Sequence, residues 1–402
     1  LWGLIGTGGF DALIFFLGCI IIAGLYGAIT TSSLILFIQA LPAAVAMPLL
    51  ILNNYNKPQA KTMNCYTKNT IKLISSFYLL SALVACSPAS DNTTEKPAAQ
   101  TDTTTKEAIN KEFPYSFEKV TDNTWVMHGP RELPNPQNKG FMNNPGIVQT
   151  SAGLVMIDPG STVQVGENVL TEVKKISDLP IVAVFNTHIH GDHWLANQAV
   201  KAAYPEVTIY GHPEMLAEIE NGEGENWLSL MDSMTEGASK GTIVVAPDNA
   251  VDNSNIIKVG ETQFKIHHYG IAHTRTDIMI EVIENSVIFL GDNVLSLRIP
   301  RTSDGTFQGN ISTIKTILET DAKTYVPGHG PTGDRAMVET YLGYLSAIYE
   351  AAQKAFEDDL DSSDVIGITK ETTVAYKDWQ GYNDLLGPQG AQAYSEVEAA
   401  EF

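Results

Sequence analysis

Residues 187–193 place three histidines and an aspartate around a tight turn, in the order Thr-His-Ile-His-Gly-Asp-His. His188 and His190 are separated by one residue, so at the end of a strand both imidazoles point to the same side. Asp192 and His193 follow a glycine that eases the turn, and they can face a second ion. Zinc and similar metals bind imidazole nitrogen and carboxylate oxygen. The segment predicts a reactive metal site, because closed structural zinc sites are usually rich in cysteine.

Four further motifs complete this pattern. They are Ile-Asp-Pro-Gly with Asp158, Ala-His-Thr-Arg-Thr-Asp with His273, Gly-Asp with Asp292 after an apolar stretch, and Pro-Gly-His-Gly with His329. Together with His-x-His-x-Asp-His they resemble the signature of the metallo-β-lactamase superfamily. The resemblance covers about residues 115–335. It implies an α/β fold, the αββα sandwich, in which two facing mixed β-sheets carry helices outside and metals at one edge.

The resemblance also implies a role for each site residue. It assigns one zinc ion to His188, His190 and His273, a second to Asp192, His193 and His329, and a bridging position to Asp292. Asp158 would support these ligands from behind. Zinc lowers the pKa of a bound water toward ~7, which gives a hydroxide nucleophile at neutral pH. Asp192 would be catalytic as well, since a buried carboxylate beside a metal can orient the nucleophile and accept its proton. Iron and manganese are the alternative metals.

The function that this set implies is a zinc-dependent hydrolase, which cleaves an ester, thioester, lactone or lactam bond in a small molecule. The familiar β-lactamases of the superfamily carry Cys where this chain has Asp292, an acid shared with glyoxalase-II-like thioesterases and lactonases. The carboxy-terminal region is short and acidic, which argues against glutathione thioesters. The alternatives are a β-lactamase, a mononuclear iron enzyme like the persulfide dioxygenases, and a binding protein with a decayed site. Seven intact ligand positions argue against decay.

Residues outside the motifs are candidates for a substrate pocket. Trp194, beside the histidine motif, and Trp227, in a predicted loop that begins at residues 222–226, have rings that can line one, although simple packing explains them equally well. Arg298 and Arg301 follow the Asp292 strand and can clamp an anionic substrate. The remaining histidines are expected to be packing or surface residues, namely His128, His212, His267 and His268.

The charge and the cysteines of the chain limit its partners. The 402 residues carry a formal net charge of −21. Such a surface repels polyanions, so we expect no nucleic-acid partner. The three cysteines are Cys19, Cys65 and Cys86, so the region downstream of residue 86 holds no disulfide and no thiolate ligand.

Residues 63–86 resemble a bacterial lipoprotein signal peptide, with two lysines ahead of a mostly apolar stretch. The sequence Leu-Val-Ala-Cys then matches a lipobox. Cys86 is therefore predicted to be lipidated and to anchor the protein in a membrane on the periplasmic side, in the outer membrane because serine follows. Residues 1–62 form an apolar segment that is predicted to lie upstream of the true start at Met63.

The rest of the chain divides by composition. Residues 87–112 are rich in small and polar residues and are predicted to be a disordered tether. Residues 113–335 form the predicted metallo-β-lactamase-fold domain. Residues 336–402 form a helical extension, with an amphipathic helix over 338–352. Strands are expected at 124–127, 146–150, 154–157, 181–185, 207–210, 242–245, 263–267, 278–282 and 286–290, and a helix at 195–204.

Overall fold

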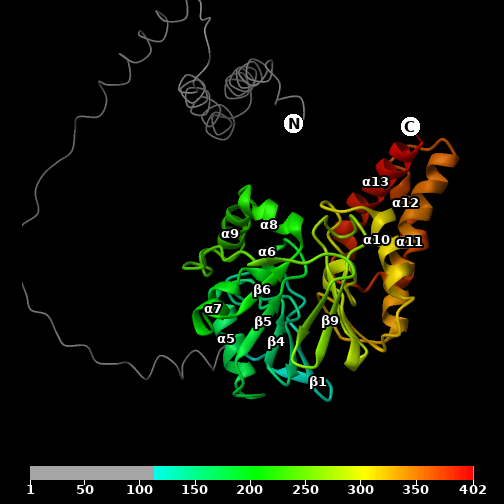
Figure 1. Ribbon diagram of the computed structural model, residues 1–402. Coiled ribbons are helices and arrows are strands. Elements are labelled where there is room, and N and C mark those ends of the chain that lie inside the picture. Colours follow the sequence, from blue (N-terminus) through cyan, green and yellow to red (C-terminus); the bar gives the residue numbers. More distant parts are fainter. Residues whose placement is uncertain (1–112, 402) are drawn as a thin grey trace, which may run out of the picture. The chain divides into compact units, whose positions relative to one another are not determined.

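The structure of the protein is a computed structural model, and it describes residues 113–401. The predicted apolar segment, signal peptide, lipidation site and tether lie outside the described residues. Figure 1 shows two sheets side by side, with helices on their outer faces. Within residues 113–401, no helix combines the length and the apolar character that crossing a bilayer requires.

The first sheet has seven strands that follow one another in chain order. They are β1 (Phe117–Thr121), β2 (Thr124–Met127), β3 (Gly146–Thr150), β4 (Gly153–Ile157), β5 (Ile181–Phe185), β6 (Thr208–Gly211) and β7 (Asn249–Ala250). Strands β1 to β4 pair antiparallel, and β4 to β7 pair parallel. Short turns join β1 to β2 and β3 to β4, whereas the parallel strands need the longer helical connections that follow β4 and β5.

The second sheet has five strands in the order β12-β11-β10-β9-β8. They are β8 (Ile256–Val259), β9 (Thr262–His267), β10 (Met279–Val282), β11 (Val287–Phe289) and β12 (Thr324–Val326). All neighbours pair antiparallel except β11 and β12, which are parallel. The connection between those two contains α10 (Phe307–Ile317), as a parallel crossover requires.

The two sheets pack face to face through one hydrophobic layer. Along β4, Val155 and Ile157 belong to this layer, whereas Leu154 and Met156 belong to the cluster on the opposite face. Phe289 of β11 enters the layer from the second sheet. A strand that is buried on both faces must be apolar at every position, and β4 is.

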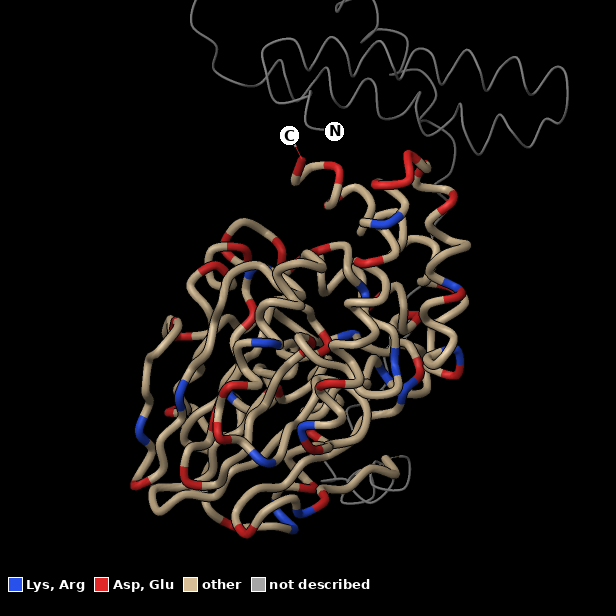
Figure 2. Tube along the Cα trace, turned by 90° about the vertical axis from the view of Figure 1, so that its right-hand side faces the viewer, with Lys and Arg blue, Asp and Glu red and all other residues tan. Residues whose placement is uncertain are grey.

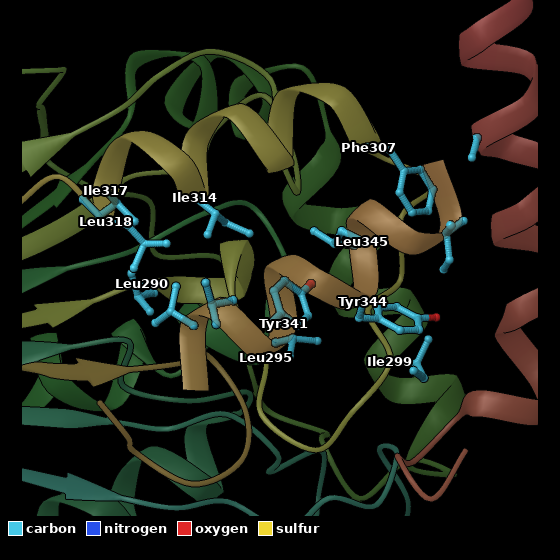
Figure 3. Close-up of a cluster of buried hydrophobic side chains, with 14 of the residues drawn as sticks. Leu290, Leu295, Ile299, Phe307, Ile314, Ile317, Leu318, Tyr341, Tyr344 and Leu345 are labelled. Carbon is cyan, nitrogen blue, oxygen red and sulfur yellow. The ribbon is translucent and has the colours of Figure 1, made fainter. Parts of the chain in front are cut away.

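Helices cover the outer face of each sheet. Besides α10, they are α5 (Val163–Val173), α6 (Gly191–Trp194), α7 (Asn197–Ala203), α8 (Pro213–Glu220), α9 (Glu223–Met234), α11 (Arg335–Glu357), α12 (Val365–Thr372) and α13 (Tyr382–Ala400), with short 3-10 turns η3 (Ile283–Asn285), η4 (Gly291–Asn293) and η5 (Val374–Tyr376). Helices α5 and α7 pack on the first sheet, and α10 and α11 on the second. Figure 3 shows the second contact, in which Tyr341 and Leu345 of α11 lie near Ile314 of α10. The architecture is the expected αββα sandwich.

The C-terminal helices share the hydrophobic core of the second sheet. Val365 of α12 and Leu386 and Val397 of α13 are buried in the same cluster as α10 and α11. Trp379 packs on Tyr344, with ring centroids 5.5 Å apart. Acidic residues lie along the outside of these helices (Figure 2). The extension therefore thickens the outer layer of the second sheet.

Two expectations about local structure are wrong, and the other expected strands are confirmed within one residue at each end. No strand forms at 242–245, where the N–H of Ile243 donates to the side chain of Gln198 instead of to a sheet. Residues 222–226 are not a loop that carries Trp227, because α9 begins within them. The glycines and acidic residues at the start of α9 do not predict a helix, and its apolar residues follow later in the sequence.

Candidate metal centre

The histidine and aspartate motifs follow the ends of strands at one edge of the sheets. β5 ends at Phe185, and the turn after it leads into α6, which carries Asp192 and His193. β11 is followed by η4, which carries Asp292, and its parallel neighbour β12 leads to His329. Residues that follow the carboxyl ends of parallel strands meet at the same edge. The topology therefore brings motifs together that lie far apart in sequence.

The seven predicted ligands form two adjacent groups. The first contains His188, His190, His273 and Asp292, and one candidate ligand atom of each lies within 4.8 Å of the others. The second contains Asp192, His193 and His329, by the same measure. All seven residues are at most 8% exposed. This division matches the two sets that the sequence motifs implied.

Asp292 lies between the two groups. Its Oδ1 is 3.2 Å from Nε2 of His193, and its Oδ2 is 3.3 Å from Nε2 of His329 and 3.6 Å from Nε2 of His273. One carboxylate thus reaches both groups, as a bridging ligand must. A Cβ at Gly328 would overlap its Oδ1, so the loop before His329 can come this close only with glycine at that position.

Hydrogen bonds to the outer ring nitrogens orient the imidazoles, and Nδ1 of His188 lies 2.9 Å from Oγ1 of Thr187. Nδ1 of His193 donates to Oδ2 of Asp158 at 2.8 Å, and Nδ1 of His329 donates to the carbonyl of Met142 at 2.7 Å. Asp158 is held in turn by the N–H and the hydroxyl of Thr187, at 2.8 and 2.7 Å. With the proton on the outer nitrogen, the inner nitrogen presents a lone pair to the centre.

Asp304 is a site residue that the sequence motifs did not reveal. Its Oδ2 lies 3.0 Å from Nε2 of His190, which leaves Nδ1 of that ring facing the centre. The hydrogen bond from His190 lowers the pKa of Asp304 to about 2. Asp304 stands before a glycine in a loop between η4 and α10, and such a pair ordinarily marks a turn. Only the packing of the loop shows its contact with His190.

The inner ring nitrogens of the histidines are arranged as ligands of a cation. Nε2 of His188 is buried and has no hydrogen-bond partner among the described residues, which is rare for a buried polar atom. Nε2 of His273 lies 3.0 Å from Nδ1 of His190, and Nε2 of His193 lies 3.3 Å from Nε2 of His329. The two nitrogens of each pair are therefore close enough to bind the same ion.

Burial and charge separate the histidines into two kinds. Burial lowers the pKa of His273 to about 3 and that of His188 well below its usual value. Burial acts in the same direction on His193 and His329, but nearby carboxylates, Asp292 foremost, raise the pKa of both. The first group therefore offers neutral imidazoles, whereas an ion at the second group must displace protons.

A cavity of about 430 Å³ opens beside the two groups. Trp227, Arg298 and Arg301 line it, and all three are candidate substrate contacts from the sequence. Trp194 does not line it, so of the two alternatives for this residue the structure favours simple packing. It is fully buried, and its Nε1 donates to the carbonyl of Ile189 at 2.7 Å. Trp194 therefore supports the turn that carries the histidines from inside.

A third group of candidate ligand atoms contains His212, Asp252 and His268. The two rings stack with centroids 4.1 Å apart. The N–H of Glu214 donates to Nδ1 of His212, and Nδ1 of His268 donates to the carbonyl of Asp277. The first bond places the proton of His212 on Nε2, 3.5 Å from Oδ1 of Asp252, so each of the two rings has a partner within the protein. The remaining histidines, His128 and His267, also bond to side chains of the protein.

Two mixed sheets between helices, with two buried groups of histidine and aspartate at one edge, define a metal-binding αββα protein. Residues 138–329 match the family model of the metallo-beta-lactamase superfamily. The chain therefore carries a domain of the metallo-β-lactamase superfamily. Residues 1–51 match a second model, that of a protein family of unknown function (DUF1304).

The curated relatives match over parts of their length. The chain is 34% identical to the linear primary-alkylsulfatase of Pseudomonas sp. over 79 residues, which are 18% of this chain and 15% of that protein. It is 28% identical to the hydroxyacylglutathione hydrolase of Gloeothece citriformis over 151 residues, 38% of this chain and 49% of that protein. The chain thus spans about half of the second relative and much less of the first.

Two solved structures are similar to the chain, and the one with a TM-score above 0.5 supports the fold. The chain resembles a stereoselective inverting sec-alkylsulfatase from Pseudomonas sp. with a TM-score of 0.54 and 15% identity, over 70% of this chain and 50% of that chain. A metallo-beta-lactamase from Pontibacter korlensis has a TM-score of 0.46 and 21% identity, over 58% of this chain and 99% of that chain. At these identities the likeness concerns the fold alone.

Proposed function

We propose that the chain is a hydrolase that uses two metal ions, with zinc as the preferred metal, to cleave an ester, thioester, lactone or lactam bond. The observation that carries the proposal is the convergence of two adjacent buried ligand groups, with Asp292 in contact with both. His188, His190 and His273 would hold one ion, and Asp192, His193 and His329 the other.

The chemistry divides between the ions and the protein. Bound divalent ions lower the pKa of water and polarise the bond to be cleaved. Asp192 lines the cavity, with Oδ2 3.3 Å from Nε2 of His329. Burial acts to raise the pKa of Asp192, but His193 and His329 outweigh it and lower that pKa. The carboxylate is therefore ionised near neutral pH, which suits it to accept a hydrogen bond from the reacting water and to orient it.

The alternatives fit the site less well. A β-lactamase of the familiar kind would carry Cys at position 292. A mononuclear iron enzyme would need only one of the two ligand groups. Asp192, His193 and His329 would then bind no metal ion. An alkylsulfatase and a hydroxyacylglutathione hydrolase stand among the relatives, and both names describe hydrolysis.

A substrate panel tests the proposal. Zinc-loaded full-length chain should hydrolyse at least one of p-nitrophenyl acetate, a small thioester, a lactone and a lactam. A chelator should stop the reaction, and added zinc should restore it. His188→Ala should lower kcat/KM by at least about 1,000-fold, in the range that loss of a central catalytic group costs. His128→Ala, which lies outside both groups, should leave the rate unchanged. Full metal content with no turnover of any substrate would contradict the proposal.

A further inference from the structure

One wall of the cavity is an apolar face of α9. Trp227, Leu230, Met231 and Met234 all line the cavity, and their spacing of three and four residues places them on one side of the helix. Leu230 is 38% exposed, so part of its side chain is in contact with water. Met231 packs into the core, whereas Trp227, Leu230 and Met234 leave part of this face open to the cavity.

The opposite wall is also largely apolar. It comes from residues 295–301 and from the start of α13, where Leu295, Ile299 and Leu385 line the cavity. Figure 1 shows α9 beyond one sheet and α13 beyond the other. Leu133, which is 60% exposed, also lines the cavity. A chain of CH₂ groups placed between these walls would remove apolar surface from water on both sides.

Arg298 supplies positive charge on the same wall. Its Nη1 donates to the carbonyl of Arg131 at 3.2 Å, and it makes no ion pair with a carboxylate among residues 113–401. Burial lowers the pKa of its guanidinium, while the charges of Asp292 and Asp192 raise it. A half-buried guanidinium without a carboxylate partner is poorly satisfied, and a planar anion satisfies it well. Asp384 also lines the cavity and is exposed.

From these walls we infer the substrate class: a single-chain amphiphile, with an alkyl or acyl chain along α9 and an anionic group paired with Arg298 near the metal centre. The inference rests on the proposed hydrolytic function and names its substrate. For a carboxylic ester, the oxygen of water bonds to the carbonyl carbon, the bond from that carbon to the leaving oxygen breaks, and a proton of water goes to the leaving oxygen. The anionic group itself is a carboxylate or a sulfate.

Binding of alkyl sulfonates, which are not cleaved, tests the inference without relying on turnover. Butyl, hexyl and octyl sulfonate are titrated into the zinc-loaded full-length chain, below their micelle concentrations, by calorimetry. Each CH₂ that enters the cavity should lower Kd about fourfold. The matching alkanoates should show the same trend, and a difference between the two series identifies the preferred anion. An octyl trimethylammonium ion should bind at least tenfold more weakly than octyl sulfonate.

Two variants separate the apolar wall from the charge. Arg298→Met should raise Kd for octyl sulfonate at least tenfold, whereas Arg335→Met, which removes an exposed arginine of α11 paired with Glu339, should not. Leu230→Ser should weaken octyl sulfonate more than butyl sulfonate. Ile256→Ser replaces an exposed isoleucine that does not line the cavity. It should leave the Kd values of both sulfonates unchanged.

The outcomes distinguish this inference from the proposed function. Kd values that do not depend on chain length, or that do not respond to Arg298→Met, would overturn the substrate class. If p-nitrophenyl acetate is still hydrolysed in that case, the hydrolytic function stands and only the amphiphile is wrong. Chain-length-dependent binding without hydrolysis of any ester would support the amphiphile site and count against the hydrolase.

Discussion

The imidazoles of the centre differ in how firmly the protein holds them. The partner of His193 is Asp158, which two hydrogen bonds from Thr187 fix in turn. The partner of His190 is Asp304, whose side chain is 48% exposed. Water competes for an exposed carboxylate, so such a contact holds its partner less firmly. The orientation of His190, a candidate ligand of the first group, therefore depends on the loop that carries Asp304.

A methyl group at position 328 should disturb the centre without touching a ligand ring. Gly328→Ala would push against Oδ1 of Asp292 and the backbone of Gly291. We expect zinc affinity to fall by at least tenfold, measured by competition with a chelator. The matched control is Gly367→Ala in α12, where an added Cβ meets nothing within 4 Å. That change should keep zinc affinity and raise the free energy of unfolding by about 0.5–1 kcal/mol. Equal zinc affinity in both variants would refute the close approach.

Zinc affinity should fall as the pH falls. The carboxylates around the second group raise the pKa of His193 and His329, so the metal-free rings hold protons that zinc must displace. Below those raised pKa values, affinity should drop by about tenfold per pH unit for each proton displaced. Chelator competition at several pH values, corrected for titration of the chelator, measures the slope. An affinity that does not change with pH would show that the rings are already neutral.

The residues of the site were predictable where the chemistry is local. His188, His190, Asp192 and His193 stand within six residues, so spacing alone points to a metal. Asp304 has no such context. Met142 contributes a carbonyl, which every residue type has, so no pattern in the sequence marks it.

At the scale of elements, α13 holds the loop that carries Asp304. Gln389, Gln392 and Glu396 lie three or four residues apart, on one face of the helix. The groups that they bond are the carbonyls of Pro300, Thr302 and Gly305 and the N–H of Phe307, the first residue of α10. The C-terminal helix is thus connected to His190 through the loop between them.

Loss of the contact between α13 and the loop that carries Asp304 should weaken metal binding. Gln392→Ala removes the bonds to the two carbonyls and to the hydroxyl of Thr302, worth about 0.5–1.5 kcal/mol each. We expect a lower melting temperature and weaker zinc binding, because the loop with Asp304 loosens. Ser395→Ala is the control, since its hydroxyl bonds only to its own helix, at the carbonyl of Ala391. If both variants bind zinc as the parent does, α13 does not position the loop.

The fold was predictable from sequence where strands are strongly apolar. The run at 181–185 is β5 with the same bounds, because five apolar residues before a turn fit only a buried strand. The run at 242–245 is also mostly apolar, but side chains of α7 take its backbone hydrogen bonds. Oε1 of Gln198 accepts from the N–H of Ile243, and Nδ2 of Asn197 donates to the carbonyl of Val245. Helix α9 was missed because its first residues are glycine and acidic residues and its apolar residues follow later.

At the scale of the whole molecule, we propose that a lipid on Cys86 tethers the domain to a bacterial outer membrane, facing the periplasm. Cys86 lies outside the described residues, and the support is the lipobox in the sequence. In a chain expressed from Met63, Cys86→Ser should shift the protein from the membrane to the soluble fraction on cell fractionation. Cys65→Ser, in the same segment, should leave it in the membrane. Membrane association of both variants would rule out this anchor.

Metal content tests the central claim most directly. Elemental analysis of the purified full-length chain, incubated with zinc and then dialysed, should give about two ions per chain. Asp292→Asn keeps the shape of the bridge but removes its charge, so it should lose at least one ion and most of the turnover. Asp158→Asn should weaken the second group most, and the first group less, because Asp158 bonds His193 directly and reaches His188 only through the hydroxyl of Thr187. One ion per chain in the parent protein, or two ions and full activity in Asp292→Asn, would contradict the two-metal centre.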